Sequence, residues 1–144
     1  MTYEDYEDNF VDRLKMLGAA VSALPTVEVL NDPRPTAKAC VYVMYNGSTY
    51  SDLKNITATV QKETLNFEVF IKAKNRRGKN GIFALTEEIK GRVMGWRPGG
   101  AITPVALSSF GYVTGTQNNW QYMLSFTFDR YAVQRDFIEE PRDQ

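Results

Sequence analysis

A helical pattern of hydrophobic positions opens the chain. The apolar residues that carry it follow one another at intervals of three or four: Phe10, Leu14, Leu17, Val21 and Leu24. This spacing places them on one face of an amphipathic helix, which is the arrangement that core packing requires. Acidic residues crowd the first turns, where the helix dipole favours negative charge. We therefore predict a helix over residues 3–24 that ends before Pro25.

Alternation of apolar and polar positions indicates strands over much of the remaining chain. The clearest alternation lies in residues 65–73, and the pattern of 37–45 is partly apolar on both faces, which is typical of a central strand. The predicted strands are 26–30, 37–45, 56–61, 65–73, 103–112 and 120–133. Residues 31–36 are predicted as a loop, 46–48 as a turn, and 61–64 as a hairpin connection.

A second helix is predicted over residues 82–94. Its apolar positions are Ile82, Leu85, Ile89 and Val93, and Gly95 follows as a helix terminator. The order of elements then favours an α+β fold, a twisted and mainly antiparallel sheet with two helices packed on one face. Residues 1–135 are expected to form a single domain, and residues 136–144 a charged C-terminal tail.

The composition removes several classes of chemistry. The 144 residues include no His and one Cys, and 17 basic residues balance 17 acidic ones. Catalysis that depends on His, an internal disulfide and a paired-cysteine metal site are all excluded. No run of apolar residues approaches a membrane span, and the acidic N-terminus does not resemble a signal peptide. We find no catalytic cluster, so we expect a protein that is not an enzyme, binds no cofactor or metal and contacts no membrane.

A group of basic residues with no acidic residue among them follows the clearest strand. Its members are Lys72, Lys74, Arg76, Arg77 and Lys79. Such a cluster attracts phosphate or an acidic protein surface. The alternative is a solvated connection between a strand and a helix.

An acidic run at the N-terminus forms the opposite charge pole. It contains Glu4, Asp5, Glu7 and Asp8, followed by Asp12. A neutral protein with one acidic and one basic patch can associate head to tail, and such contacts close into rings when the rotation allows. Aromatic residues on the less apolar strand faces could add to an interface or form a second core layer; they are Tyr42, Tyr50, Phe70, Tyr112 and Tyr131.

The chain resembles the tail terminator proteins of long-tailed phages, in particular those of the Mu-like contractile group. The resemblance rests on the Phe-Val-Asp-Arg-Leu segment at 10–14, on the Gly-Trp-Arg-Pro turn that ends the segment 89–98, and on the aromatic closing strand 120–128. It covers the order of elements along most of the chain. Its motifs are structural.

The resemblance implies a structural virion protein that forms a ring, usually of six copies, at the head-proximal end of the tail. Such a ring caps the tail tube, stops its growth and provides the surface to which neck and head dock. The implied partners are further copies, the tail tube protein, sheath and neck proteins, and DNA that passes through the lumen without sequence-specific binding. Assembly is expected in the host cytoplasm.

Two sets of site residues follow as hypotheses. The basic residues Lys74, Arg76, Arg77 and Lys79 are expected to face the lumen or the tube, and the acidic residues Glu4, Asp5, Glu7 and Asp8 to face a neighbouring subunit.

Other functions stay open at this point. The chain could be another head–tail joint protein, such as a neck or head-completion protein, or a tail tube subunit, which would polymerise into long filaments. A small nucleic-acid-binding module would need surface aromatics beside the basic residues. An enzyme would have to rely on carboxylate, Lys or Ser chemistry.

Overall fold

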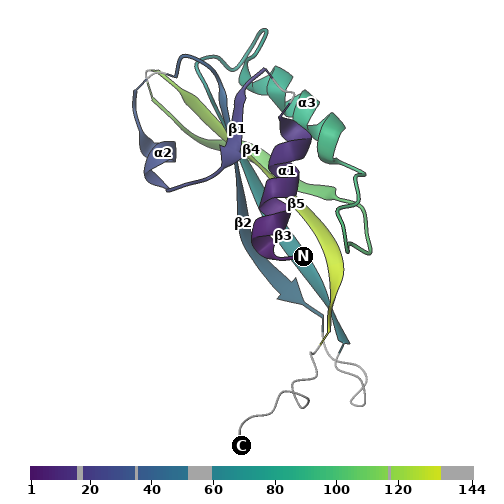
Figure 1. Cartoon of the computed structure of the whole chain (residues 1–144). Coiled ribbons are helices and arrows are strands. Elements are labelled where there is room, and N and C mark those ends of the chain that lie inside the picture. The colour runs from purple at the N-terminus through teal and green to yellow at the C-terminus, as the bar shows by residue number, and fades with distance from the viewer. Residues whose placement is uncertain (16–17, 35, 52–59, 117, 134–144) are drawn as a thin grey trace, which may run out of the picture.

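The fold is a five-stranded sheet with three helices. A computed structural model describes residues 1–15, 18–34, 36–51, 60–116 and 118–133. The elements follow in the order α1 (Tyr3–Leu14), β1 (Ala20–Ala23), α2 (Glu28–Asn31), β2 (Cys40–Tyr50), β3 (Val60–Ala73), α3 (Ile82–Val93), β4 (Ala106–Gly115) and β5 (Trp120–Val133) (Figure 1). The predicted α+β class is confirmed.

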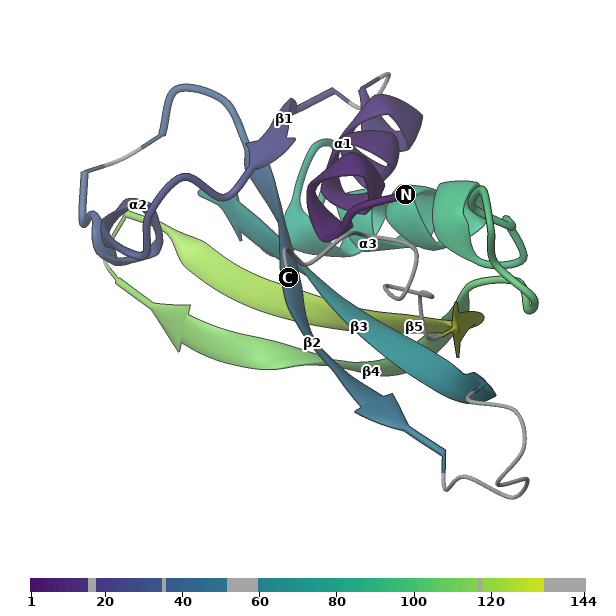
Figure 2. The ribbon, with the colours of Figure 1, turned by 60° about the horizontal axis from the view of Figure 1, so that its bottom comes forward.

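The sheet is open, with β1 at one edge and β4 at the other. Its strand order is β1-β2-β3-β5-β4. The pair β1–β2 is parallel and the other three pairs are antiparallel. As predicted, the second strand is internal and the sheet is mainly antiparallel. Figure 2 shows α1 and α3 together on one face.

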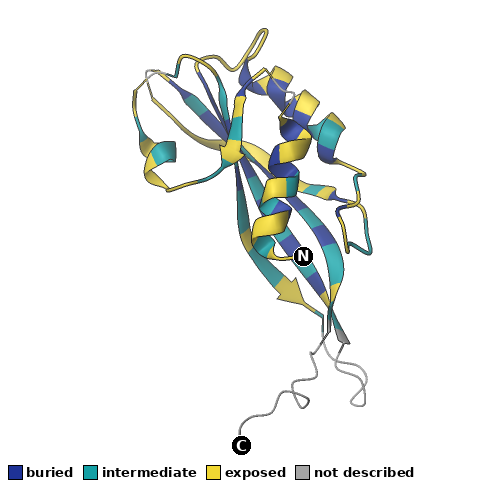
Figure 3. Ribbon diagram, in the orientation of Figure 1, coloured by how far each residue is buried: buried dark blue, intermediate teal, exposed yellow. Residues whose placement is uncertain are grey.

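The core lies between this face and the two long helices. On β3, Leu65, Phe67 and Val69 are fully buried, and their partners on β5 are buried as well. The Phe10 ring of α1 stacks on Phe67 with 4.8 Å between ring centroids. Loss of such a buried ring typically costs about 3–5 kcal/mol. Leu85 of α3 also belongs to this cluster, and Figure 3 shows the buried positions running along β3 and β5.

The segment 28–34 covers one end of the opposite sheet face. The Lys72 side chain points to that face, is 4% exposed, and donates from Nζ to the carbonyls of Val29 at 2.9 Å and Asp32 at 2.7 Å. The Asn119 amide donates to the Arg34 carbonyl at 2.7 Å. The two bonds from Lys72 satisfy its buried ammonium group, whose burial without partners would cost stability.

The helix predicted over 3–24 ends at Leu14, and the prediction is wrong for residues 18–24, whereas residues 16–17 lie outside the described residues. The Ala20 amide donates to the Ala39 carbonyl at 2.8 Å, so this backbone pairs in the sheet as β1. Gly18 is a poor helix former, and the core-facing residues of β1 are Val21 and Ala23, spaced by two. The helical spacing through this segment was therefore coincidental.

Four further boundaries differ from the prediction. The strand predicted at 26–30 is replaced by α2. The turn predicted at 46–48 lies within β2, where a bulge between Tyr45 and Gly47 precedes Gly47, whose φ is 139°. The hairpin predicted at 61–64 is wrong, because β3 pairs with the 14-residue β5 along its whole length. The strand predicted at 103–112 begins and ends three residues later as β4.

The strands predicted at 37–45 and 65–73 are confirmed as strands, but β2 spans Cys40–Tyr50 and β3 spans Val60–Ala73. Two other predicted elements stand close to their predicted bounds. The second helix, predicted over 82–94, is confirmed as α3, and the strand predicted at 120–133 is confirmed as β5. Of the strand predicted at 56–61, residues 56–59 lie outside the described residues, as does the tail predicted at 136–144.

Candidate functional site

The basic loop, which we define by Lys74, Arg76, Arg77 and Lys79, connects the end of β3 to the start of α3. All four side chains are exposed. Within the described part of the chain, none of them forms an ion pair with an acidic group. Lys72 is not part of this surface, because its ammonium group is buried beneath the segment 28–34.

Backbone hydrogen bonds hold the basic loop in place. The Ile82 amide donates to the Asn75 carbonyl at 2.9 Å, and the Phe83 amide to the Arg76 carbonyl at 3.0 Å. The loop thereby satisfies two of the amides that a helix N-terminus leaves without a partner. Asn80 adopts a left-handed conformation with φ of 62°, which Asn tolerates better than most residues. Gly81 is required, because a Cβ there would lie 2.7 Å from the Arg77 carbonyl oxygen.

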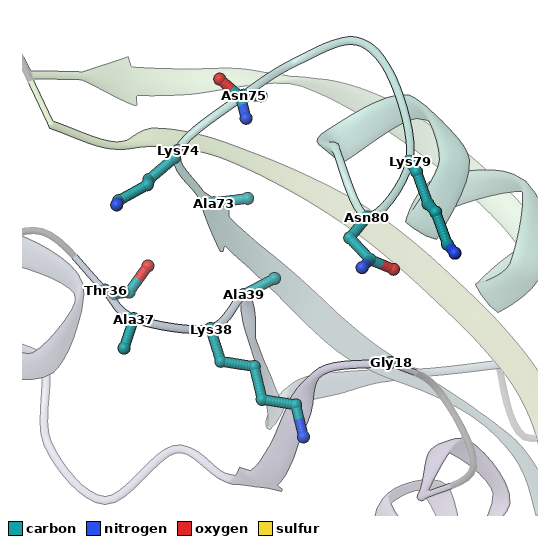
Figure 4. A pocket seen from close by; sticks show the side chains of 10 residues that line it. All are labelled: Gly18, Thr36, Ala37, Lys38, Ala39, Ala73, Lys74, Asn75, Lys79 and Asn80. Atoms are coloured by element: carbon teal, nitrogen blue, oxygen red, sulfur yellow. The ribbon is translucent and has the colours of Figure 1, made fainter.

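Two members of the basic loop line a polar hollow of about 190 Å³. Lys74 and Lys79 share its rim with Lys38, and Thr36 and Asn80 add polar groups. Figure 4 shows Lys74 pointing away from Lys38 and Lys79, so the three ammonium groups do not meet at one point. The hollow thus carries positive charge on its rim, which suits an anionic group of a larger partner better than an enclosed small ligand.

Arg76 joins the basic loop to aromatic side chains. Its guanidinium lies 4.7 Å from the centre of the Trp120 ring and 5.9 Å from that of Phe83. Cation–π contacts of this kind hold an arginine in position while leaving its charge available.

An exposed aromatic surface lies beside Arg76, and we call it the edge patch. It consists of Phe83, Phe110 and Tyr112, which are exposed by 39–57%. The rings of Phe83, Phe110 and Tyr112 all pack around Tyr122, with centroid distances of 5.5–5.8 Å. Large exposed apolar groups that gather in this way mark interaction surfaces more often than single ones do.

The aromatic residues singled out in the sequence divide between the two expectations for them, a second core layer and an interface. Phe70 is buried and Tyr42 is half-buried on the sheet face opposite α1 and α3, which agrees with a second core layer. Tyr50, Tyr112 and Tyr131 are exposed by 50%, 57% and 58%, which agrees with surface roles.

The acidic N-terminal residues have different surroundings in the structure. Asp5 belongs to a capping box with Thr2, whose hydroxyl accepts from the Asp5 amide at 3.0 Å, and the Thr2 backbone hydrogen bond lowers the pKa of Asp5. The Glu7 carboxylate accepts from the Tyr45 amide at 2.7 Å. Both residues therefore stabilise the subunit itself.

The remaining acidic residues form an exposed line along α1, which we call the acidic stripe: Glu4, Asp8 and Asp12. Their spacing of four places them on one helix face. Asp12 pairs with Lys15 at 3.0 Å, and both side chains are mostly exposed. Glu4 and Asp8 form no ion pair with another described residue, so their charges are available to a partner.

A buried carboxylate that the sequence did not single out ties α1 to the sheet. Glu63 is 1% exposed and accepts from the Tyr3 hydroxyl at 2.6 Å, the Ser48 hydroxyl at 2.7 Å and the Arg130 guanidinium at 2.7 Å. The Tyr50 hydroxyl adds a bond of 3.1 Å. Burial alone would raise the pKa of Glu63, but the bonds from Tyr3, Ser48 and Arg130 outweigh it and lower that pKa.

Two observations limit the chemistry of the described residues. They contain no group of three or more His, Cys, Asp or Glu side chains placed to hold a metal ion. None of their helices is long and apolar enough to cross a membrane. What the described surface does offer is separated charge and exposed aromatic area.

Comparison with known proteins gives the family. A family model described as Gp37 protein matches residues 20–142, most of the chain. The chain belongs to the Gp37 family. Membership places it among bacteriophage proteins, as the sequence resemblance implied at this coarser level. No curated protein matches the chain. The Gp37 match includes the basic loop and the edge patch, whereas the acidic stripe on α1 precedes it.

Proposed function

We propose that this Gp37-family chain is a tail terminator of a contractile-tailed, Mu-like phage. In this role several copies, six in the expected ring, sit on the head-proximal end of the tail tube. The ring stops tube growth and offers the surface to which neck, sheath and head components dock. Membership of a phage family supports the proposal, as do the motifs at 89–98 and 120–128. The role involves no catalysis and no cofactor.

The observation that carries the proposal is the separation of Glu4, at the N-terminal end of the acidic stripe, from the basic loop. Glu4 lies next to Tyr3, which binds Glu63 at one end of β3, whereas the basic loop follows Ala73 at the other end. Ten residues of extended strand between Glu63 and Ala73 span about 33 Å. Glu4 therefore cannot reach the loop of its own chain. Two copies can bring the charges together, and such head-to-tail contacts close into rings.

The basic loop has a second proposed role in the assembled ring. Arg76, Arg77 and Lys79 face either the lumen, where DNA passes, or an acidic surface of the tube. Replacing all three with Glu should impair tail completion while the subunit still folds. Infection and tail length that match wild type would contradict this role.

The proposal is tested by the assembly state of the full chain. Solution mass at high protein concentration should be combined with negative-stain images of the same sample and with tail tubes to which the protein is added. Closed rings that bind one end of the tubes would support a terminator. Long filaments formed by the protein alone would indicate a tail tube subunit, and binding to heads without tubes would indicate another head–tail joint protein.

One observation favours a second candidate, a module that binds single-stranded nucleic acid. Such modules combine positive charge with aromatic side chains on which bases stack. Phe83 and Tyr112 are exposed, and Arg76 lies 5.9 Å from the Phe83 ring. Anisotropy of a labelled oligonucleotide separates the two candidates. Micromolar binding that Tyr112→Ala abolishes would favour the module, and weak binding that 200 mM salt removes would leave only general charge attraction.

A further inference from the structure

Both edges of the sheet lack the charges that normally protect a free edge. About one residue in four of this chain is charged, yet β4 (Ala106–Gly115) has no charged residue among its ten, and neither does the segment 18–24 that contains β1. Natural edge strands are usually blunted by charge, by Pro, by bulges or by short length, because their free amides and carbonyls pair with other chains. Here β1 is short and β4 has register shifts after Leu107 and Tyr112, but neither strand carries a charge. The two bare edges are therefore candidates for strand pairing.

The two edge strands also lie at the same level along the strand direction. Continuous rows of paired residues cross all five strands. One row runs Ala23–Val43–Val69–Leu124–Phe110, the next Ser22–Tyr42–Phe70–Met123–Gly111, and the next Val21–Val41–Ile71–Tyr122–Tyr112. The short β1 thus stands level with the half of β4 that carries the edge patch. A neighbouring copy related by rotation about the strand direction would present β1 at this level.

The strand directions suit such a contact. β1 runs parallel to β2, and each later step across the sheet reverses direction, so β4 runs opposite to β1. In copies of the same orientation, β4 of one would meet β1 of the next as an antiparallel pair, which is the more stable arrangement.

The side chains on the helix face are complementary in size. β4 presents the large rings of Phe110 and Tyr112, which are 39% and 57% exposed. β1 presents the smaller Val21 and Ala23, which are only partly buried by their own subunit. Pairing would bring large rings against small side chains and cover apolar area that the isolated subunit leaves in water.

We propose that β4 of one copy pairs with β1 of the next, so that the sheet continues from subunit to subunit around the ring. This inference rests on the proposed ring and names strand pairing as the contact that closes it. It is an alternative to the contact between Glu4 and the basic loop, because copies at the same level keep those two groups at opposite ends of the strands. The contact is heterologous, because it uses two different edges, and each copy contributes one edge to each of its two neighbours. The second copy is the occupant that both bare edges and their common height favour.

Disulfide trapping tests the contact directly. Ser22 and Gly111 share a row, both are exposed, and a Cβ on Gly111 would meet no atom within 4 Å. Four strand spacings separate them in one chain, about 19 Å, which is far beyond the Cα distance of about 7 Å that a disulfide spans. In a Cys40→Ser background, the double variant S22C/G111C can therefore cross-link only between copies.

The expected result on oxidation is a ladder of cross-linked species from the double variant, with neither single variant extending beyond a dimer. Dimers from G111C alone, with nothing added by S22C, would show β4 paired with β4 and overturn the inference. Absence of cross-linking in the double variant at high concentration would overturn it as well. A cross-linked ladder from protein that does not cap tail tubes would support the contact and contradict the terminator role, whereas capping without cross-links would do the reverse.

A charge placed on the edge gives an independent readout. Tyr112→Lys supplies the protecting charge that β4 lacks, and Tyr131→Lys is its matched control, since Tyr131 is equally exposed at 58% but lies on β5. We expect Tyr112→Lys to reduce the solution mass to that of one subunit at concentrations where the control still assembles. Equal assembly of both variants would overturn the inference.

Discussion

At the scale of single residues, Glu63 is the side chain whose loss should disturb the subunit most. It joins α1, β2, β3 and β5 through bonds from Tyr3, Ser48 and Arg130. Glu63→Gln keeps the size but removes the charge that Arg130 faces. Because breaking one partner of a buried ion pair is costly, we expect a loss of about 3 kcal/mol in the free energy of unfolding. Urea unfolding measures it, with the exposed Glu87→Gln as control. A variant as stable as wild type would contradict this assignment.

The Glu63 carboxylate should also make the free energy of unfolding depend on pH. The pKa of Glu63 in the folded subunit lies below its ordinary value of 4.5, despite burial, because of the bonds that it accepts. Its stabilising contribution is therefore complete above pH 4.5 and is lost as the pH falls through the lowered folded value. Urea unfolding of wild type and Glu63→Gln should show a constant difference from pH 7 to about pH 5 that shrinks at lower pH.

Glu68 supplies a comparison of opposite sign. Burial raises the pKa of Glu68, so its charge costs stability at neutral pH, and that cost disappears as the pH falls below the ordinary value. Glu68→Gln should consequently be more stable than wild type at pH 7. Parallel pH profiles for the two variants would show that neither carboxylate titrates as described.

At the scale of elements, the sequence predicts a strand or helix well where one physical requirement dominates. β5 and α3 follow their apolar periodicity, because each buries one face against the same core. β1 could not be predicted, since its pairing depends on β2, twenty residues away, and a helical spacing fitted the same residues. Glu63 was missed because a charged residue was assigned to a turn, although it continues the alternation of Leu65 and Phe67.

The candidate site, too, could be predicted from the sequence only in part. The basic loop was visible in the sequence as a cluster of charge, and the structure places it as predicted between a strand and a helix. The edge patch was not visible, because Phe83 and Phe110 come together only through the pairing of β4 with β5 and the position of α3. The different roles of Asp5 and Glu7 also depend on contacts with Thr2 and Tyr45.

Two glycines near or within α3 should respond in opposite ways to the same substitution. Gly81→Ala would bring a Cβ to 2.7 Å from the Arg77 carbonyl oxygen, which the rigid loop backbone cannot easily avoid. We expect a loss of about 1–3 kcal/mol. Gly91 lies within the helix on an exposed face with open space around it, so Gly91→Ala should add about 1 kcal/mol. Thermal unfolding of both variants tests this pair, and a stable Gly81→Ala would mean that the loop is free to shift.

At the scale of the whole molecule, attraction between the acidic stripe and the basic loop of a neighbour predicts that association weakens with salt. The charges are exposed, and raising the ionic strength from about 0.1 M to 1 M shortens the screening length from about 10 Å to 3 Å. Solution mass measured across this range should fall toward that of one subunit. Assembly indifferent to salt would show that strand pairing alone holds the copies together.

A charge exchange between two variants tests which surfaces meet. Glu4→Lys/Asp8→Lys makes the stripe basic, so that it faces a basic loop, and Lys74→Glu/Arg77→Glu/Lys79→Glu makes the loop acidic, so that it faces an acidic stripe. Each variant alone should fail to assemble, because like charges then face one another at every contact. An equimolar mixture restores opposite charges at every contact, provided that the two variants alternate around the ring. We therefore expect assembly only in the mixture, and a ring of six accommodates this alternation because its number of subunits is even.

Assembly of either variant alone at low salt would exclude this pair of surfaces, whereas strand pairing between β4 and β1 would be judged separately by its cross-links.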